Sequence, residues 1–211
     1  MQPWQDRSHD LGSLDKLRAV YPAPEAPATL DKECDHVHAL YRPFIEAAPF
    51  CVLATRGPRG LDTSPRGDPA GKLVEVADEK TLLLPDRRGN NRIDSLRNVL
   101  HDPEVALLFL IPGIGEALRV NGSARISAAP ALLQRFELEG KLPRSVLVVD
   151  VRLVFFQCAR AIKRSGLWDP RQQIARSTLP STGTILQALS PRVDGAAYDA
   201  ALEERQKATL Y

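Results

Sequence analysis

Short apolar runs, separated by Gly, Pro, Asn and Asp, fill the middle of the chain from Phe50 to Gln157. Runs of this kind between turn-forming residues are typical of β-strands. Six segments have the pattern: residues 50–56, 71–78, 81–85, 104–111, 117–127 and 145–157. Residues 61–68, which follow a turn, are predicted as a further extended segment. Two inserted segments, 93–100 and 130–140, have the apolar spacing of helices. Repeated strands with few helices between them favour a closed or partly open antiparallel barrel over alternating β-α units.

Helical patterns dominate the two flanks of this region. Residues 31–48 predict a helix with Asp31 as its N-cap and a kink or restart at Pro43. After residue 157, helical segments alternate with polar loops, and the last predicted helix is 196–207. Before residue 31, prolines at positions 22, 24 and 27 interrupt the chain. The expected organisation is an N-terminal extension at 1–30, a barrel domain at 31–165 and a C-terminal helical segment at 166–211, packed on the barrel.

Composition allows a sizeable core but does not point to nucleic acid. A chain of 211 residues, 44% of them hydrophobic, buries roughly 70% of its unfolded surface on folding. The net charge is only +2, from 28 basic and 26 acidic side chains, so bulk charge gives no reason to expect nucleic-acid binding. The basic loops contain no aromatic residues, which counts against stacking on single-stranded bases.

Cysteine and histidine are too few and too scattered for a metal site. The three cysteines, Cys34, Cys51 and Cys158, form no close pair, and no Cys or His cluster has zinc spacing. We therefore expect no metal and interpret the cysteines as small apolar residues of a reducing compartment. The N-terminus has no apolar signal region, and the longest apolar run, 105–111, is too short to cross a bilayer. A soluble, cytoplasmic protein without membrane association is the expectation.

The most informative segment is the strand, loop and helix from Thr81 to Asn98. Its loop is rich in Arg, Asn and Gly and joins a predicted strand to a predicted helix start. Unpaired backbone N–H groups at a helix start and guanidinium groups both bind phosphate oxygens. The candidate ligand-binding residues of this loop are Asp86, Arg88, Asn90, Asn91 and Arg92. The alternative interpretation is a solvated basic turn.

Three other segments carry weaker signals. The extended segment 61–68 offers hydroxyl, backbone and guanidinium groups to a flat polar ligand, although an edge strand ending in a turn has the same pattern. Its candidate residues are Thr63, Ser64, Pro65 and Arg66. Gly122, within the strand at 117–127, indicates a β-bulge. Arg160 and Trp168 belong to a cationic helical segment that either covers a flavin or nucleotide or anchors itself to the barrel through the Trp.

Common catalytic motifs are absent from the sequence. The chain contains no P-loop, no G-x-S-x-G and no strand-linked G-x-G-x-x-G motif. Its four His residues are remote in sequence from Ser64 and Ser145, so nothing points to a Ser-His-Asp triad. The sequence therefore singles out no catalytic residue.

Together, these motifs resemble those of a known family. The segments SPRGD, PDRRGNNR, LRVNG and RSGLW, at 64–68, 85–92, 118–122 and 164–168, are similar to motifs of the FMN-binding split-barrel flavoproteins related to pyridoxamine 5'-phosphate oxidase. The resemblance extends over roughly residues 30–190. It is closest to a poorly characterised bacterial subgroup.

The resemblance implies a mainly β protein with flanking helices (α+β), built on a six-stranded antiparallel split β-barrel. It also implies a homodimer with one FMN in each of two clefts at the subunit interface, so the C-terminal segment 166–211 is expected to pack on the partner subunit as well as on the barrel. The residues expected beside the isoalloxazine ring are Thr63, Ser64, Pro65 and Arg66. Those expected around the ribityl chain and phosphate are Asp86, Arg88, Asn90, Asn91 and Arg92. Arg160 and Trp168 are expected to reach the cofactor from the other subunit.

The expected function is that of an FMN-dependent oxidoreductase, which transfers a hydride between the flavin and a small molecule. The chain ends EERQKATLY, without the basic C-terminal segment that binds the substrate phosphate in pyridoxamine 5'-phosphate oxidases, so we expect a different substrate. Three alternatives stay open. They are a non-catalytic flavin or haem carrier or redox sensor, a deazaflavin-dependent reductase, and a nucleic-acid-binding barrel.

Overall fold

The structure, a computed structural model, describes residues 2–21, 23 and 27–211. Its internal contacts divide the chain into two compact units, residues 1–33 and 34–211. The first unit holds η1 (Pro3–Gln5), α1 (Leu14–Val20) and α2 (Ala28–Asp31). Ser13 caps α1 by accepting a hydrogen bond from the backbone N–H of Lys16, and α1 buries none of its residues. Pro22 and Pro24, two of the prolines expected to interrupt this stretch, lie outside the described residues.

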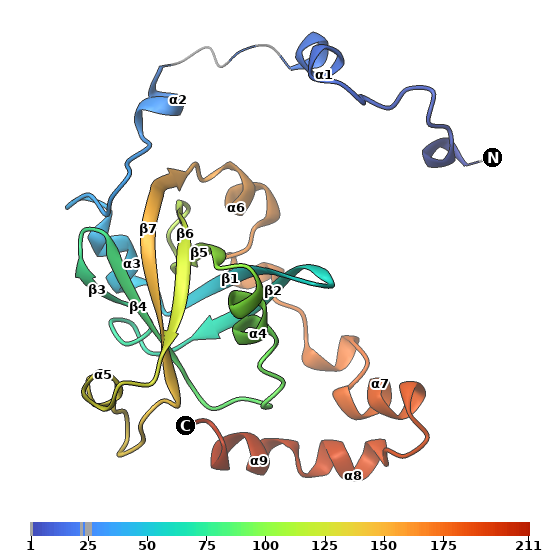
Figure 1. Cartoon of the computed structure of the whole chain (residues 1–211). Coiled ribbons are helices and arrows are strands. Elements are labelled where there is room, and N and C mark those ends of the chain that lie inside the picture. Colours follow the sequence, from blue (N-terminus) through green and yellow to red (C-terminus); the bar gives the residue numbers. More distant parts are fainter. Residues whose placement is uncertain (1, 22, 24–26) are drawn as a thin grey trace. The chain divides into compact units, whose positions relative to one another are not determined.

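One antiparallel sheet of seven strands forms the body of the second unit (Figure 1). The strands are β1 (Phe50–Gly57), β2 (Gly60–Gly67), β3 (Glu75–Asp78), β4 (Thr81–Asp86), β5 (Glu104–Leu110), β6 (Ala117–Ser127) and β7 (Ser145–Gln157). Their order across the sheet is β2-β1-β5-β6-β7-β4-β3, so strand pairing within the described chain leaves β2 and β3 as open edges. The split-barrel class is confirmed, but the six strands implied by the resemblance are one too few, because the short β3 adds an edge strand beside β4.

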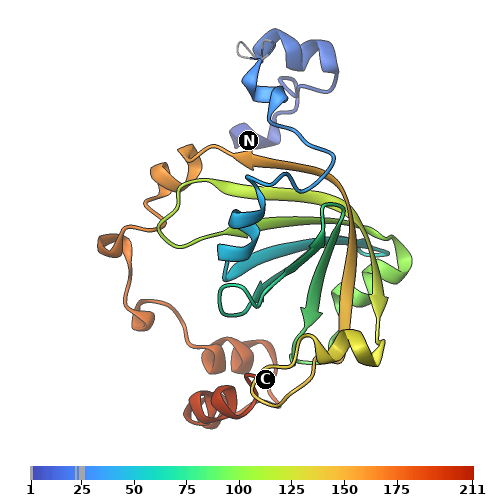
Figure 2. The same ribbon diagram turned by 90° about the vertical axis from the view of Figure 1, so that its left-hand side faces the viewer.

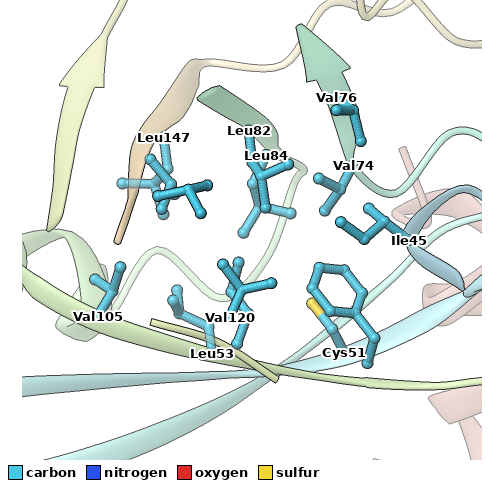
Figure 3. Packing of buried hydrophobic residues seen from close by; sticks show 14 of the residues in the cluster. Ile45, Cys51, Leu53, Val74, Val76, Leu82, Leu84, Val105, Val120 and Leu147 are labelled. Atoms are coloured by element: carbon cyan, nitrogen blue, oxygen red, sulfur yellow. The ribbon is translucent and has the colours of Figure 1, made fainter. Parts of the chain in front are cut away.

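The sheet curls around one hydrophobic core (Figures 2 and 3). In the core, Leu53 of β1 and Val120 of β6 face Leu82 and Leu84 of β4. Ile45 enters the same cluster from α3 (Arg42–Ala47). This enclosure places the apolar side chains of strands far apart in the sequence against one another.

The unbroken apolar run of β4 has a structural reason. Four successive residues of β4, from Leu82 to Pro85, are buried. Leu82 and Leu84 face the main core, whereas Leu83 joins a smaller cluster with Phe136, Val146 and Val148. Leu132 and Leu133 of α5 (Pro130–Gln134) pack on this second cluster. Both faces of β4 are therefore covered, as a fully apolar strand requires.

Helix α4 (Asp94–His101) follows the loop that leaves β4 and packs against β1. The Asn98 amide donates a hydrogen bond to the Thr55 hydroxyl over 3.0 Å. Gly57 lies directly against Asn98, and a Cβ at Gly57 would come within 1.9 Å of the Asn98 Oδ1 atom. This close approach positions α4 against the β1–β2 hairpin.

The predicted β-bulge is present. The register between β6 and β7 shifts between Asn121 and Gly122. A Cβ at Gly122 would lie 2.2 Å from the carbonyl oxygen of Asp150 on β7. Gly122 therefore permits close contact between the two strand backbones, and the structural interpretation of this glycine is correct.

The helix predicted at 31–48 is much shorter in the structure. Asp31 ends α2 instead of capping a helix, and α3 begins only at Arg42. Pro43 lies in the first turn of α3, where a backbone N–H has no helical partner to lose. Pro43 therefore starts a helix and does not kink one.

Two further helix boundaries differ from the prediction. The segment 130–140 is helical only to Gln134, and Gly140 lies, with φ +73°, in the turn between Leu138 and Lys141. The last predicted helix, 196–207, divides into α8 (Gly195–Ala200) and α9 (Leu202–Ala208). None of the described helices combines the length and apolar character needed to span a bilayer.

The C-terminal helices pack mainly on one another. After β7 come α6 (Arg160–Ser165), two 3-10 turns, η2 (Pro170–Gln172) and η3 (Arg176–Thr178), and α7 (Thr182–Leu189). The Asp199 carboxylate of α8 accepts hydrogen bonds from the Ser181 hydroxyl and from the Gly183 N–H over 2.8 Å. These bonds lower the pKa of Asp199 and hold α7 against α8.

Candidate functional site

A cavity of about 800 Å³ lies where the end of β2, the loop after β4 and the start of α4 come together. Its volume falls in the range of small-molecule sites, roughly 300–1,000 Å³. Leu73 and Leu84 contribute apolar lining. Nine of the eleven residues selected from the sequence line it: Thr63, Ser64, Pro65, Arg66, Asp86, Arg88, Asn90, Asn91 and Arg92.

Two ion pairs at this cavity link the end of β2 to the end of β4, with Asp68 directly after β2 and Arg87 directly after β4. The Arg66 Nη1 atom lies 2.7 Å from the Asp86 Oδ1 atom, and both side chains are less than a fifth exposed. The Arg87 Nε atom lies 2.7 Å from the Asp68 Oδ2 atom, with side chains 14% and 2% exposed. β2 and β4 are not neighbours in the sheet, so no backbone hydrogen bonds join them. The two ion pairs therefore connect the two sides of the curled sheet through side chains alone. We call these four residues the clasp.

The clasp is fixed further by the second hydrophobic cluster. The Arg87 Nη1 atom donates a hydrogen bond to the carbonyl oxygen of Phe136 over 2.5 Å. Phe136 itself packs against β4 and β7. Charges this far from water are weakly screened. Because the clasp residues are largely buried, removing one side chain of an ion pair leaves its partner buried without a counter-charge.

Three buried polar atoms at the cavity have no hydrogen-bond partner among the described residues. They are the Arg66 Nε, the Asp68 Oδ1 and the Ser145 Oγ. Ser145 begins β7 directly opposite Asp86, so strand pairing brings its hydroxyl to the clasp. A buried polar atom without a partner costs about 1–3 kcal/mol. Three such atoms on one cavity, two of them able to donate a hydrogen bond, indicate that a polar ligand completes the site.

The loop between β4 and α4 is held in an unusual conformation. Asn91 and Ile93 have φ values of +59° and +51°, which side-chain-bearing residues rarely adopt, a β-branched residue least of all. The Asn90 Oδ1 atom accepts from the Arg92 N–H over 3.1 Å. The Asn91 Oδ1 atom accepts from the Arg144 Nη1 over 2.8 Å. The carbonyl groups of both Asn side chains therefore fix the loop, and strain of this kind gathers at functional sites.

The two loop arginines expected to bind phosphate differ in their surroundings. The Arg92 Nε atom lies 2.8 Å from the Asp94 Oδ2, and this hydrogen bond is the main cause of the lowered pKa of Asp94. Arg88 has no ion-pair partner in the described part of the chain and is exposed. Arg88 is thus the loop cation most available to a ligand.

A second cavity of about 470 Å³ shares several of these residues. Its lining is strongly basic, and consists of Arg87, Arg88, Lys141, Leu142, Pro143, Arg144 and Tyr211. Arg87, Arg88, Arg144 and Tyr211 line both cavities. The cationic side of the site therefore continues from the loop after β4 to the segment before β7.

Arg160 and Trp168 do not line either cavity of this chain. Arg160 is exposed on α6. The Trp168 indole N–H donates to the carbonyl oxygen of Ile114 over 2.7 Å, which attaches the segment after α6 to the β5–β6 loop. Within one subunit, Trp168 therefore acts as the anchor that the sequence allowed as an alternative to a ligand contact.

The residues that reasoning from the sequence missed include Asp68, Arg87, Arg144 and Ser145, and also Tyr211. The sequence did contain a signal for Asp68 and Arg87. The basic residue comes first in Arg66-Gly67-Asp68 and the acidic residue comes first in Asp86-Arg87, so two such segments side by side can form two ion pairs. Arg144 and Ser145 are remote in sequence from the loop, and only the pairing of β4 with β7 brings them to it.

Among the described residues, neither a cysteine nor a cluster of metal-ligand side chains lines the larger cavity. The described residues include no cluster of three or more His, Cys, Asp or Glu able to hold a metal ion. None of the three cysteines forms a disulfide bond within the described residues. Burial raises the pKa of the Cys51 thiol to about 12, so this thiol is unreactive at neutral pH.

Comparison with known proteins identifies the family. The model of the family described as pyridoxamine 5'-phosphate oxidase matches residues 37–158, more than half of the chain. The chain belongs to the pyridoxamine 5'-phosphate oxidase family. That family is of the flavin-binding oxidoreductase type. The match includes all seven strands and the nine predicted residues that line the larger cavity.

Solved structures show more distant similarity. HupZ of Group A Streptococcus is 16% identical, over 55% of this chain and 89% of that chain, with a TM-score of 0.45. A Clostridium acetobutylicum protein of the pyridoxinephosphate oxidase family, related to general stress protein 26, is 12% identical over 56% and 84%, with a TM-score of 0.43. An F420 reductase is 21% identical over 54% and 93%, with a TM-score of 0.39. A comparison with curated proteins finds no significant match.

Proposed function

We propose that this protein binds FMN in the larger cavity and acts as an oxidoreductase on a small molecule. The observation that carries the proposal is the set of three unpartnered buried polar atoms, on Arg66, Asp68 and Ser145, that face a basic cavity of suitable volume. Family membership supports a flavin ligand. The choice of FMN rests on the separation of the cavity into a basic side and an apolar, hydroxyl-bearing side.

The residues present fit FMN. Arg88, with Arg144 beside it, supplies the guanidinium groups that bind a phosphate dianion through paired hydrogen bonds. The Ser145 hydroxyl and the Arg66 Nε–H are donors suited to the oxygen atoms of a ribityl chain or a flavin ring. Leu73, Leu84 and Pro65 offer apolar contact to a flat ring.

When bound, FMN would supply hydride transfer. The protein would contribute orientation, electrostatics and exclusion of water. The clasp would hold the Arg66 guanidinium in one place, because Asp86 occupies its Nη1 and leaves its Nε free. A fixed positive charge beside a flavin ring stabilises negative charge that develops there. The proposal assigns no acid or base.

We also propose a homodimer in which Arg160 and Trp168 approach the cavity of the partner subunit. Both residues lie outside the cavity of their own chain, and Arg160 is exposed. The expected substrate is a small molecule other than pyridoxamine 5'-phosphate, and the expected location is the cytoplasm. Size-exclusion chromatography with light scattering tests the dimer.

The first experiment is the near-ultraviolet and visible spectrum of the freshly purified protein, followed by the mass of any released chromophore. Two flavin bands and the mass of FMN would support the proposal. The mass of a deazaflavin would favour the deazaflavin-dependent reductase, and a Soret band would favour a haem carrier. A colourless protein that also fails to bind added FMN would overturn the proposal.

A second measurement separates an enzyme from a carrier. Reduced nicotinamide is added to the FMN-loaded protein without oxygen, and the loss of flavin absorbance is followed. Bleaching that a small-molecule acceptor reverses indicates turnover. Tight FMN binding without bleaching by any reduced nicotinamide indicates a carrier or redox sensor.

A further inference from the structure

The last residues of the described chain return to the cavity. Tyr211 lines both the larger and the smaller cavity, and Leu210 lines the larger one. The carbonyl oxygen of Tyr211 accepts a hydrogen bond from Lys141 Nζ over 3.0 Å. The Tyr211 phenol lies near the carboxylate of Asp68 in the clasp, and its pKa is raised by burial and by that charge.

The segment that carries Tyr211 is loosely attached elsewhere. Residues 171–180 are all exposed. Beyond them, α7, α8 and α9 pack on one another and make few contacts with the sheet. Both views show these helices beside the barrel, with the chain end turning back toward the β4–β7 side (Figures 1 and 2). Residues 181–208 therefore form an arm, and residues 209–211 are its tip.

The arm has its own internal structure, so its tip moves with it. The Gly195 N–H donates to the Gln187 Oε1 atom over 3.0 Å, in addition to the bonds between Asp199 and α7. Gly183 and Gly195 approach so closely that a Cβ on Gly183 would lie 2.0 Å from the Gly195 carbonyl oxygen. A rigid arm on an exposed connection, held at its tip by one hydrogen bond from an exposed lysine, has the properties of a lid.

We propose that the tip closes over the ligand bound in the larger cavity, with Tyr211 as the closing side chain. The cavity of about 800 Å³ is present with Tyr211 already in its wall, so the tip covers a ligand and does not compete with it. The proposal rests on the proposed function in taking FMN as the ligand. The aromatic ring of Tyr211 provides apolar contact to the ligand, and closure of the tip reduces the access of water to the cationic side of the cavity.

The test compares Tyr211→Ala with Tyr198→Ala in the full-length chain. Tyr198 is a matched control, because it is a half-buried tyrosine of the same arm that stacks on Arg205 and lines neither cavity. We expect Tyr211→Ala to speed FMN release and to raise the Kd roughly five- to tenfold, which corresponds to about 1–1.4 kcal/mol. Tyr198→Ala should leave both values unchanged, and Tyr211→Phe should restore most of the affinity.

Hydrogen–deuterium exchange of residues 202–211 gives a second readout. Saturating FMN should slow exchange in this segment of the wild-type protein and should have no such effect in Tyr211→Ala. FMN binding that is equally tight in Tyr211→Ala, or tighter, would overturn the lid while leaving the proposed function intact. If neither the wild-type protein nor Tyr211→Ala binds FMN, both proposals fall.

Discussion

Two basic segments of this chain look alike in sequence and differ in what surrounds them. The loop after β4 carries Arg87, Arg88 and Arg92, and α6 carries Arg160, Lys163 and Arg164. In the structure, Arg87 is buried in the clasp and the loop lines the cavity, whereas all three cations of α6 are exposed and none lines a cavity. Local charge therefore does not distinguish a site from a solvated surface.

Burial and incomplete hydrogen bonding do make the distinction. The loop meets a carboxylate with one unpartnered oxygen, an arginine with one unpartnered N–H and a buried serine hydroxyl. After α6, the indole N–H of Trp168 is satisfied by its hydrogen bond to the carbonyl oxygen of Ile114. A ligand gains more at the first place, because it completes groups that are already desolvated.

Breaking the clasp should have the largest effect. Arg87→Met leaves the Asp68 carboxylate buried without its partner, and we expect it to lower the free energy of unfolding by about 3–5 kcal/mol. Urea denaturation of the ligand-free protein measures this. The control is Arg171→Met, which breaks an ion pair with Asp169 in which the arginine is exposed and which should cost less than about 1 kcal/mol. Equal losses in the two variants would show that the clasp is no stronger than a surface pair.

Removing Arg88, the loop cation without an ion-pair partner among the described residues, should weaken FMN binding and leave the stability of the fold unchanged. Arg88→Ala should reduce FMN affinity by about 1.5–3 kcal/mol, the value of a hydrogen bond to a charged group. Arg92→Ala should have a smaller effect, because Asp94 already neutralises part of its charge. Fluorescence titration with FMN measures both. A larger loss of FMN affinity in Arg92→Ala than in Arg88→Ala would indicate that the phosphate binds at the start of α4.

The exposed segment offers the opposite test. If the partner subunit's cavity receives α6, Arg160→Ala should weaken FMN binding by about 1 kcal/mol or more, while Arg164→Ala on the same helix should not. The titration is repeated below the dimer dissociation concentration. Loss of the difference there would confirm that Arg160 acts across the interface. No difference at any concentration would leave α6 as a solvated surface.

Ser145→Ala should have the smallest effect. It should leave the stability of the ligand-free protein unchanged or raised, and it should lower the affinity for FMN. The Ser145 hydroxyl is buried without a partner, so its removal should leave the ligand-free protein equally stable or more stable by up to about 1 kcal/mol. FMN affinity should fall by about 1 kcal/mol, because a donor to the ligand is lost. Thermal unfolding with and without FMN compares the two. A loss of stability without FMN would mean that the hydroxyl serves the fold and not the ligand.

The sequence by itself determined the strands and the loop that carries the site. Apolar runs between turn residues identified six of the seven strands, because a strand covered on one or both faces must be apolar there, and β2 was predicted as an extended segment between turns. Gly122 was correctly interpreted as a bulge. The same local reasoning misplaced the ends of the helices at 31–48 and 130–140, since helix ends depend on caps and packing that propensity does not contain.

Only the tertiary structure decided which charged residues meet. The clasp joins β2 to β4, two strands that are not sheet neighbours, so neither spacing nor periodicity specifies it. Ser145 begins β7, which follows β4 by about sixty residues, and it reaches the cavity only because β7 pairs with β4. Whether an arginine is buried, paired or free is fixed by the groups that folding brings around it. For that reason the sequence could indicate the phosphate loop but could not separate Arg87 from Arg88, or either from Arg160.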